Sequence, residues 1–342
     1  MLVISSPDFA NHLTPPGHPE SPERGDVLEA LADAAARRGV RVSAPRRATR
    51  EELRRVHTEA HVRRIEETAG SAVALDADTY TSPSSADLAA LAAGAVLQGV
   101  DEVLAGRTRR AAALVRPPGH HAESARAMGF CLYSNVAVAA AHALAQGVSR
   151  VAVVDYDVHH GNGTQEIFYA DPRLLFVSVH QFPFYPGTGA VDEIGEGEGA
   201  GRTVNVPLDA GATDGDYLAV FERAVLPVLH EYEPELLLVS AGFDAHERDP
   251  LAQMRVTGEG FRRIAGLLRD AADRLCGGRL VLATEGGYAL DAFAASLDAT
   301  LQVLEGAEPA TQPDDALRRP TGRADRALAA LRAAQAGRWH EL

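Results

Sequence analysis

The stretch from Val151 to Gln165 constrains the fold of this chain more than any other segment. It begins with an apolar, β-branched run that is typical of a buried strand, and glycines near its end stop that strand. At a strand's period of two, the side chains of Asp155, Asp157 and His159 project to the same side. Because unpaired buried charge is strongly disfavoured, this arrangement predicts a bound divalent cation. A polar turn at the strand end is the alternative interpretation.

Apolar runs of strand length alternate with segments of helical periodicity over most of the chain. This alternation predicts an α/β fold with a mainly parallel central sheet and helices on both faces. The expected strands cover residues 1–10, 111–116, 151–157, 174–180, 204–208, 235–240 and 279–283. The expected helices cover residues 22–38, 50–68, 84–105, 135–146, 163–169, 214–232, 258–275 and 291–304.

The sequence contains no internal repeat and no clear domain boundary. We therefore predict one domain over residues 1–342, although a chain of this length is also compatible with two. The predicted core extends to about residue 305, and a helical tail covers about 306–342. Within this tail, residues 306–324 are polar with Pro and Gly, and an Ala- and Arg-rich helix ends near Gly337.

The formal net charge of -14 limits the partners that the chain can have. No basic run interleaves with aromatic residues, so direct binding of nucleic acid is not expected, whereas a cationic substrate would be attracted. No stretch approaches the roughly 18 apolar residues of a membrane span, and the chain does not begin like a signal peptide. We expect a cytoplasmic protein with no membrane partner. Cys131 and Cys276 are expected to be reduced core thiols.

Chemically reactive side chains stand directly after four of the predicted strands. In open parallel sheets ligands bind at the carboxyl ends of the strands, so these side chains are expected to form one site. Two aspartates, one histidine and an open fourth position suit a catalytic zinc ion, or another divalent metal that accepts oxygen and nitrogen ligands. The four sets are His120 with His121, Asp155 with Asp157 and His159, Asp244 with His246, and Glu285 with Tyr288.

A second histidine pair, His57 and His61, has the i, i+4 spacing that can hold a metal on a helix. No third ligand lies nearby in the sequence, and the surrounding segment is rich in Arg and Glu. A solvated helix surface is therefore the favoured interpretation.

Several long motifs resemble those of the metal-dependent histone deacetylase family, which includes bacterial acetylpolyamine amidohydrolases and acetoin-utilisation deacetylases. The match runs in order from about His18 to Tyr288. The resemblance implies the single-domain arginase–deacetylase α/β sandwich. The motifs are Arg116-Pro-Pro-Gly-His-His121, Gly129-Phe-Cys131, Asp155-x-Asp-x-His-His-Gly-Asn-Gly-Thr164, Ser240-Ala-Gly-Phe-Asp-Ala-His246 and Glu285-Gly-Gly-Tyr288.

The resemblance implies that Asp157, His159 and Asp244 bind one zinc ion per chain. Zinc in such a site polarises an amide carbonyl and lowers the pKa of its bound water towards about 7. Tyr288 matches the catalytic tyrosine, whose hydroxyl would donate a hydrogen bond to the oxyanion. Zn²⁺ or Fe²⁺ as the metal in the cell stays open.

The tandem histidines have different expected roles. His121 is the candidate general base and then general acid, while His120 stabilises charge and positions the water. Asp155 is expected to orient His120 as a carboxylate behind the ligands, and Asn162 to stand beside His121. Some relatives carry Asp in place of Asn162, so a neutral partner here is expected to leave His121 less basic.

The resemblance also implies a substrate channel. Phe130 and Tyr185 would form its walls, with the motif glycines Gly129 and Gly287 beside the substrate, and Arg24 would line the region of acetate release. A potassium ion near the zinc is expected on main-chain oxygens of Asp155, Asp157 and His159 and on the Ser178 hydroxyl. The remaining histidines of these motifs and strands, His160, His180 and His246, are expected to be structural.

Leu251 bears on the substrate. Polyamine-selective relatives place a Glu just after the Asp-Pro that follows the third zinc ligand, and here Asp249-Pro250 is followed by Leu251. This favours acyl-lysine in proteins or peptides as the substrate, with acetylated polyamines as the alternative. An arginase-like ureohydrolase and a non-catalytic acyl-lysine binding module are further alternatives. Acyl-chain length and homo-oligomer formation stay open.

Overall fold

The computed structural model of the protein describes residues 1–308 and 320–342. Its centre is an eight-stranded sheet in which every neighbouring pair of strands is parallel. This confirms the predicted α/β class with a mainly parallel sheet. In spatial order the strands are β2 (Arg41–Ser43), β1 (Leu2–Ile4), β5 (Arg110–Ala113), β10 (Leu280–Thr284), β9 (Leu236–Ala241), β6 (Val151–Asp155), β7 (Leu174–Gln181) and β8 (Thr203–Leu208).

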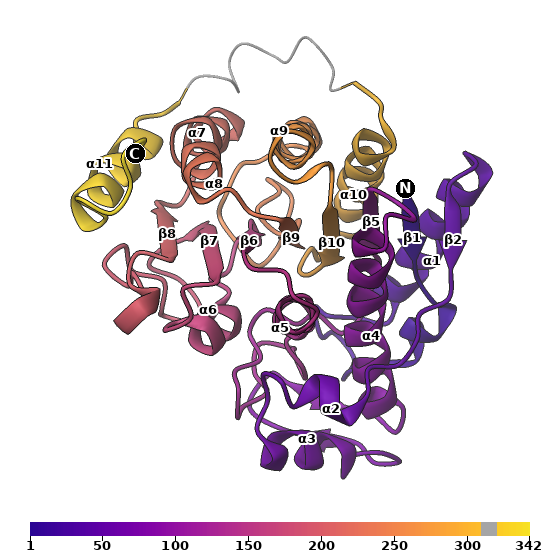
Figure 1. Cartoon of the computed structure of the whole chain (residues 1–342). Coiled ribbons are helices and arrows are strands. Elements are labelled where there is room, and N and C mark those ends of the chain that lie inside the picture. The colour runs from indigo at the N-terminus through magenta and orange to yellow at the C-terminus, as the bar shows by residue number, and fades with distance from the viewer. Residues whose placement is uncertain (309–319) are drawn as a thin grey trace.

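Helices cover both faces of the sheet because its inner strands are apolar on both sides (Figure 1). On one face, Val154 and Leu282 pack in one hydrophobic core with helices α1 (Glu23–Arg37), α7 (Asp214–Val220), α8 (Leu226–Tyr232), α9 (Gly258–Cys276), α10 (Leu290–Glu305) and α11 (Arg323–Ala334). On the other face, Val153 and Val281 pack with α4 (Ser85–Leu104), α5 (Asn135–Ala145) and α6 (Asn162–Phe168).

The chain order in the sheet brings four distant segments side by side. β5, β10, β9 and β6 are consecutive neighbours in space, although they begin at residues 110, 280, 236 and 151. Their register is level, since Asp155 lies opposite Ser240 and Ser240 opposite Ala283. These are the four strands that the reactive side chains follow, so their carboxyl ends meet at one edge.

The predicted helix at 50–68 is two helices, α2 (Arg50–Leu53) and α3 (Glu59–Glu66). The break occurs because Thr58 caps the second helix, its side chain accepting a hydrogen bond from the His61 backbone N–H. The predicted solvated surface at His57 and His61 is wrong, because both side chains are buried. His57 accepts from the Ser134 N–H, and His61 bonds the Leu132 carbonyl, so both histidines are structural.

Further elements differ from the sequence prediction. Strand β2 was not predicted, and residues 7–10 of the strand expected at 1–10 belong to a 3₁₀ helix, Pro7–Asn11. The expected helix at 214–232 contains one π turn, Phe221–Val225, just before Pro227, whose ring cannot donate the next helical hydrogen bond. A short antiparallel hairpin of β3 (Val73–Ala74) and β4 (Tyr80–Thr81) was not predicted, because two-residue strands leave no detectable alternation. Cys131 and Cys276 are buried and unpaired, as expected.

The C-terminal helix α11 covers β8, the last strand of the sheet (Figure 1). Gln335 donates to the Thr203 carbonyl and Trp339 Nε1 to the Gly201 carbonyl, so the tail satisfies acceptors at the sheet edge. Residues 309–319 of the predicted polar segment lie outside the described residues. Within the described ranges, no helix combines the length and apolar character that a membrane crossing requires. The single domain stays a prediction.

Candidate active site

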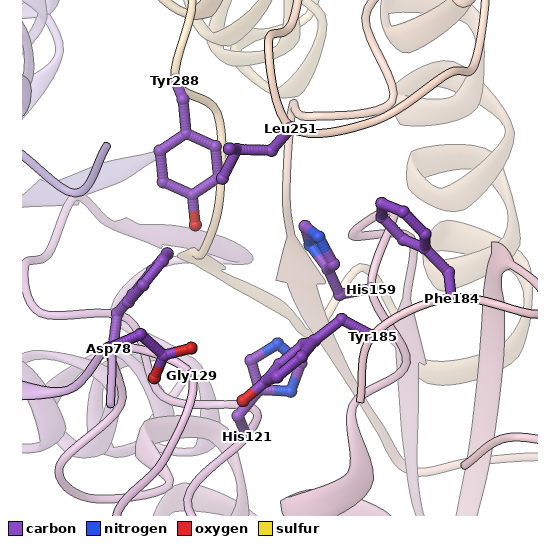
Figure 2. A pocket seen from close by; sticks show the side chains of 9 residues that line it. Asp78, His121, Gly129, His159, Phe184, Tyr185, Leu251 and Tyr288 are labelled. Carbon is purple, nitrogen blue, oxygen red and sulfur yellow. The ribbon is translucent and has the colours of Figure 1, made fainter. Parts of the chain in front are cut away.

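A narrow pocket of about 180 Å³ collects one residue from the end of each of the four central strands (Figure 2). His121 follows β5, His159 follows β6, Leu251 follows β9 and Tyr288 follows β10. The Tyr288 hydroxyl points into this space (Figure 2). The other lining residues are Asp78, Gly129, Phe130, Phe184 and Tyr185.

Aromatic rings build the walls of this pocket. Phe184 stacks on His159, with ring centroids 5.3 Å apart, and Tyr185 meets His121 edge-on at 5.2 Å. Phe130 meets Tyr288 edge-on at 5.9 Å. Of the predicted channel residues, all lie in this lining except Gly287. Phe184 and Asp78 were missed by sequence reasoning.

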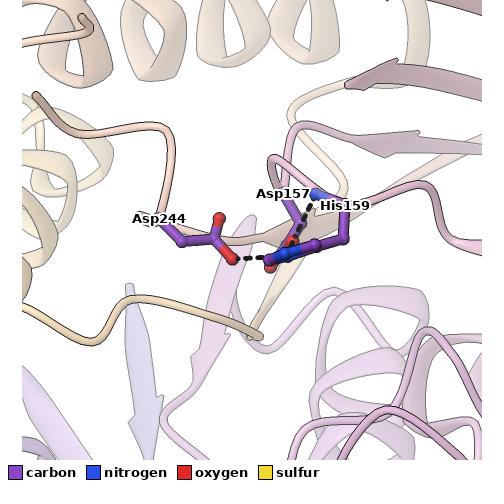
Figure 3. A group of neighbouring side chains, drawn as sticks. All are labelled: Asp157, His159 and Asp244. Carbon is purple, nitrogen blue, oxygen red and sulfur yellow. Dashed lines mark hydrogen bonds and ion pairs between the residues drawn. The ribbon is translucent and has the colours of Figure 1, made fainter. Parts of the chain in front are cut away.

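At the inner end of the site, Asp157, His159 and Asp244 form a buried cluster (Figure 3). His159 Nδ1 lies 3.2 Å from Asp157 Oδ1 and 3.0 Å from Asp244 Oδ2. One ligand atom from each residue lies within 4.8 Å of the others. Two carboxylate oxygens and one imidazole nitrogen are the donor types that zinc and similar divalent ions accept.

Local turns, and not strand alternation, place these side chains. Strand β6 ends at Asp155, so the expectation that Asp157 and His159 continue its alternation is wrong. Instead, Asp155 Oδ1 accepts from the Asp157 N–H at 3.1 Å, and Asp157 Oδ1 accepts from the His159 N–H at 2.9 Å. Two successive Asx turns thus curl the chain at the strand end.

Backbone donors hold the remaining carboxylate oxygens of the cluster. Asp157 Oδ2 accepts from the Gly286 N–H at 2.8 Å, and Asp244 Oδ1 accepts from the Val158 N–H at 2.9 Å. Asp244 is therefore oriented by one oxygen and offers the other, whereas Asp157 Oδ1 also accepts from the His159 N–H. Such orientation of ligands by surrounding hydrogen bonds strengthens a metal site.

The electrostatics of the cluster favour a bound positive charge. Burial, followed by the charge of Asp157, raises the pKa of Asp244 to about 7. Burial opposes protonation of His159, yet its hydrogen bonds to Asp157 and Asp244 raise its pKa to about 10. Two buried carboxylates thus require a cationic partner, and a divalent ion with neutral His159 meets that requirement.

The tandem histidines have different hydrogen-bond partners. His120 Nδ1 lies 3.0 Å from Asp155 Oδ2, and His121 Nδ1 lies 2.8 Å from Asn162 Oδ1. The amide orientation of Asn162 is fixed because its Nδ2 donates to Glu123 Oε1 at 2.9 Å. An amide oxygen only accepts, so His121 donates from Nδ1 and keeps a lone pair on Nε2.

Glu123 therefore explains why an amide suits position 162. Asn162 presents an acceptor to His121 and a donor to Glu123, and a carboxylate could not serve both neighbours. Sequence reasoning missed this role, although Glu123 stands only two residues after His121. Burial, together with the charges of His120 and His159, lowers the pKa of His121 well below its usual value.

Glu285, which the sequence placed at the site without a role, is a second positioning group. Its Oε2 accepts from the Gly119 N–H at 2.6 Å and the His120 N–H at 3.2 Å, and its Oε1 accepts from the Ser240 hydroxyl. Burial raises the pKa of Glu285 to about 7. The carboxylate ties the end of β10 to the loop that carries both histidines.

Tyr288 is held by two networks. Asp249 Oδ2 accepts from the Tyr288 N–H at 2.7 Å, while its Oδ1 accepts from the Leu251 N–H at 3.0 Å. From the other side, Arg24 donates from Nε to the Gly287 carbonyl at 2.8 Å and from Nη2 to the Glu285 carbonyl.

Arg24 is buried and pairs with Glu20 at 2.8 Å. Burial alone would raise the pKa of Glu20, but Arg116 and Arg24 lower it to about 2. The Arg24 guanidinium lies over the Tyr288 ring, 5.2 Å from the ring centroid. These contacts show that Arg24 positions the loop that carries Tyr288. A role of Arg24 in acetate release stays a prediction.

The remaining predicted residues have structural partners. His160 bonds Thr188 and Gln165, and His180 bonds Ser178 and the Gly189 carbonyl. His246 Nδ1 accepts from the Arg248 N–H. Ser178 lies opposite Asp155 in the register of β6 and β7, which is compatible with the predicted potassium site.

Sequence comparison matches a family profile described as "Histone deacetylase domain" to residues 18–304. A probable deacetylase of Archaeoglobus fulgidus is 38% identical over 292 residues, which are 84% of this chain and 81% of the relative. A histone deacetylase-like amidohydrolase of Pseudomonas aeruginosa is 44% identical over 282 residues, covering 80% of this chain and 73% of the relative.

Plant and human relatives are longer than this chain. Histone deacetylase 15 of Arabidopsis thaliana is 44% identical over 84% of this chain, and the match spans about half, 53%, of that protein. Polyamine deacetylase HDAC10 of Homo sapiens is 43% identical over 94% of this chain and 50% of the relative.

A solved structure shows the same fold. A crystal structure of the HDA15 HD domain superposes with a TM-score of 0.90 and 38% sequence identity, covering 99% of this chain and 94% of that chain. The residues of the site, and all strands of the sheet except β1, lie within the matched residues 18–304. The chain therefore belongs to the histone deacetylase domain family.

Proposed function

We propose that this protein is a metal-dependent amidohydrolase that removes acetyl or other short acyl groups from the ε-amino group of lysine in proteins or peptides. The observation that carries the proposal is the convergence of five side chains. Asp157, His159 and Asp244 form a ligand set, and the same site holds His121 Nε2 and the Tyr288 hydroxyl. An ion held there supplies Lewis-acid polarisation of the amide carbonyl and a lowered pKa for water.

His121 is the general base in this proposal. Its Nδ1–H donates to Asn162, so the free Nε2 can accept a proton from water and later deliver it to the leaving amine. Its low pKa keeps the imidazole neutral at pH 7. His120 pairs with Asp155; burial opposes its protonation, but the charges of Asp157 and Asp155 raise its pKa.

Tyr288 is the proposed donor to the reacting carbonyl. Burial raises the pKa of its hydroxyl well above the usual value, so the proton stays on oxygen and available for donation. The substrate carbonyl oxygen gains negative charge during attack, and a positioned donor stabilises that charge more than the ground state.

The pocket favours an acyl-lysine arm. Phe130, Phe184 and Tyr185 enclose a passage that suits four methylene groups. Leu251 lines it at the position where polyamine-selective relatives place a Glu, and Asp78 is the carboxylate in its lining. Relatives include proteins described as histone deacetylases and one described as a polyamine deacetylase. Zinc as the ion, potassium and a cytoplasmic location are further parts of the proposal, whereas homo-oligomer formation stays open.

Metal analysis and a substrate screen test this function together. We expect one zinc per chain and kcat/KM values for acetyl-lysine peptides that exceed those for acetylated polyamines. Longer acyl-lysines, tested in parallel, define the acyl-chain preference. Two manganese ions per chain would instead favour a ureohydrolase. Within residues 1–308 and 320–342, the structure contains one group of three candidate metal ligands, Asp157, His159 and Asp244. Absence of turnover with a loaded metal would favour a binding module.

Replacing the neutral partner of His121 should move its pKa. We expect the double variant Asn162→Asp/Glu123→Gln to raise the pKa of His121, because a carboxylate stabilises the imidazolium. His121 acts as a base only when it is deprotonated. The acidic limb of the pH profile of kcat/KM should therefore shift to higher pH, by about one unit or more. Glu123→Gln removes the facing carboxylate that would otherwise repel Asp at position 162.

Glu123→Gln alone is the matched control for this measurement. It keeps an oxygen facing Asn162 Nδ2 and adds no charge beside His121, so its acidic limb should stay near that of the wild type. An unshifted limb in the double variant would contradict His121 as the base.

A further inference from the structure

The structure contains an apolar groove beside the pocket that the proposed chemistry does not use. It has a volume of about 420 Å³ and is lined by residues 13–15, 72–74 and 80–83. None of these lining residues is charged. Its walls are preformed, since the Leu13 N–H donates to the Ser82 hydroxyl and the Val73 N–H donates to the Thr81 hydroxyl.

Exposed apolar side chains concentrate around these two cavities. Across the described residues, four large hydrophobic side chains are classed as exposed. Leu13 at 55% and Val73 at 37% line the groove, and Tyr185 at 38% lines the pocket. The fourth, Val42, stands on the edge strand β2 and lines neither cavity. Apolar surface left open at such places marks a binding site.

The groove and the pocket share one wall. The β3–β4 hairpin contributes Asp78 to the pocket through its turn, and Val73 and Tyr80 to the groove through its strands. His18 packs edge-on against Tyr80 at 5.6 Å and against Phe130 at 4.7 Å, so one ring separates the two cavities. Any chain that leaves the pocket on this side passes the hairpin.

We propose that the groove binds an apolar side chain of the substrate peptide, two to four residues from the acyl-lysine. This rests on the proposed function and extends it to protein or peptide substrates with a leucine-like residue near the modified lysine. The His18 ring lies between Phe130 of the pocket and Tyr80 of the groove. An extended peptide advances roughly 3.3 Å per residue, so two to four residues span this ring and its two contacts. A free polyamine has no branched apolar group, so the groove discriminates against it.

A set of peptides with one movable leucine tests the proposal. The peptides carry one acetyl-lysine in a Gly/Ser background, with Leu placed at each position up to four residues on either side. We expect one or two positions within the proposed spacing to raise kcat/KM about tenfold over the Ser peptide, mainly through KM. Leu13→Ser and Val73→Ser should each remove most of this gain.

Val42→Ser is the matched control for Val73→Ser, because Val42 is as exposed as Val73 but does not line the groove. It should keep the full leucine effect, and all three variants should hydrolyse acetyl-lysine amide as the wild type does. If no leucine position matters, or if the gain survives both Leu13→Ser and Val73→Ser, the proposal is wrong. If acetyl-lysine amide and the peptides are not hydrolysed at all, the proposed function fails and the groove assignment falls with it.

Light scattering of the wild type and of Val73→Ser tests whether a second copy of this chain, and not a substrate peptide, occupies the groove. A wild-type dimer that Val73→Ser dissociates would show that the groove is an interface between copies, and would overturn the peptide site. An unchanged oligomeric state together with a lost leucine effect supports the site. Thermal unfolding of each variant, expected within a few degrees of the wild type, checks that the fold is kept.

Discussion

Asp244→Asn is expected to remove the bound divalent ion and to lower kcat/KM by about a thousandfold or more, equivalent to roughly 4 kcal/mol of transition-state stabilisation. Asp244 offers Oδ2 to the ligand cluster while its Oδ1 accepts from the Val158 N–H. Asparagine can keep the acceptor for Val158 but loses the charge, so the effect on folding should be small. Metal content per chain and kcat/KM with an acetyl-lysine peptide measure the two results.

Asp249→Asn is the matched control for Asp244→Asn. Both aspartates are buried and lie five residues apart, but Asp249 binds the backbone of Tyr288 and Leu251 and is not in the ligand cluster. We expect this variant to keep the metal and to lose activity through a misplaced Tyr288. Full metal content and full activity in Asp244→Asn would contradict the ligand set.

Tyr288→Phe is expected to lower kcat by about a hundredfold to a thousandfold, with KM and metal content nearly unchanged. The ring stays in contact with Phe130 and Arg24, so the pocket keeps its shape, and only the hydroxyl that points into it is lost (Figure 2). Since the interaction strengthens as charge develops on the carbonyl oxygen, the loss falls on the chemical step.

Tyr185→Phe provides the comparison on the opposite wall of the pocket. Its ring packs edge-on against His121 and His159, and phenylalanine keeps those contacts. A loss below about fivefold is expected, because in this mechanism the Tyr185 hydroxyl has no role in the reaction. Equal losses in Tyr288→Phe and Tyr185→Phe would instead indicate a general effect on pocket polarity.

Much of the fold could be predicted from local patterns. Helices α4 and α9 lie within one or two residues of their predicted bounds, because long segments of helical periodicity are specified locally, and the Thr257 side chain also caps α9. The helix expected at 50–68 was wrong because Thr58 caps a new helix within it. The buried pair His57 and His61 was misjudged for another reason, since their partners Ser134 and Leu132 lie over seventy residues away.

The sequence by itself determined the order of elements, the family, and which side chains stand at strand ends, because these follow from periodicity and from long motifs. Only the tertiary structure decided how those side chains meet. Inserting β9 and β10 between β5 and β6 places Asp244 beside His159 and Tyr288 across from His121. The Glu123–Asn162 contact and the groove between Leu13 and Val73 likewise join distant segments. Such contacts depend on strand order and packing, which no local pattern encodes.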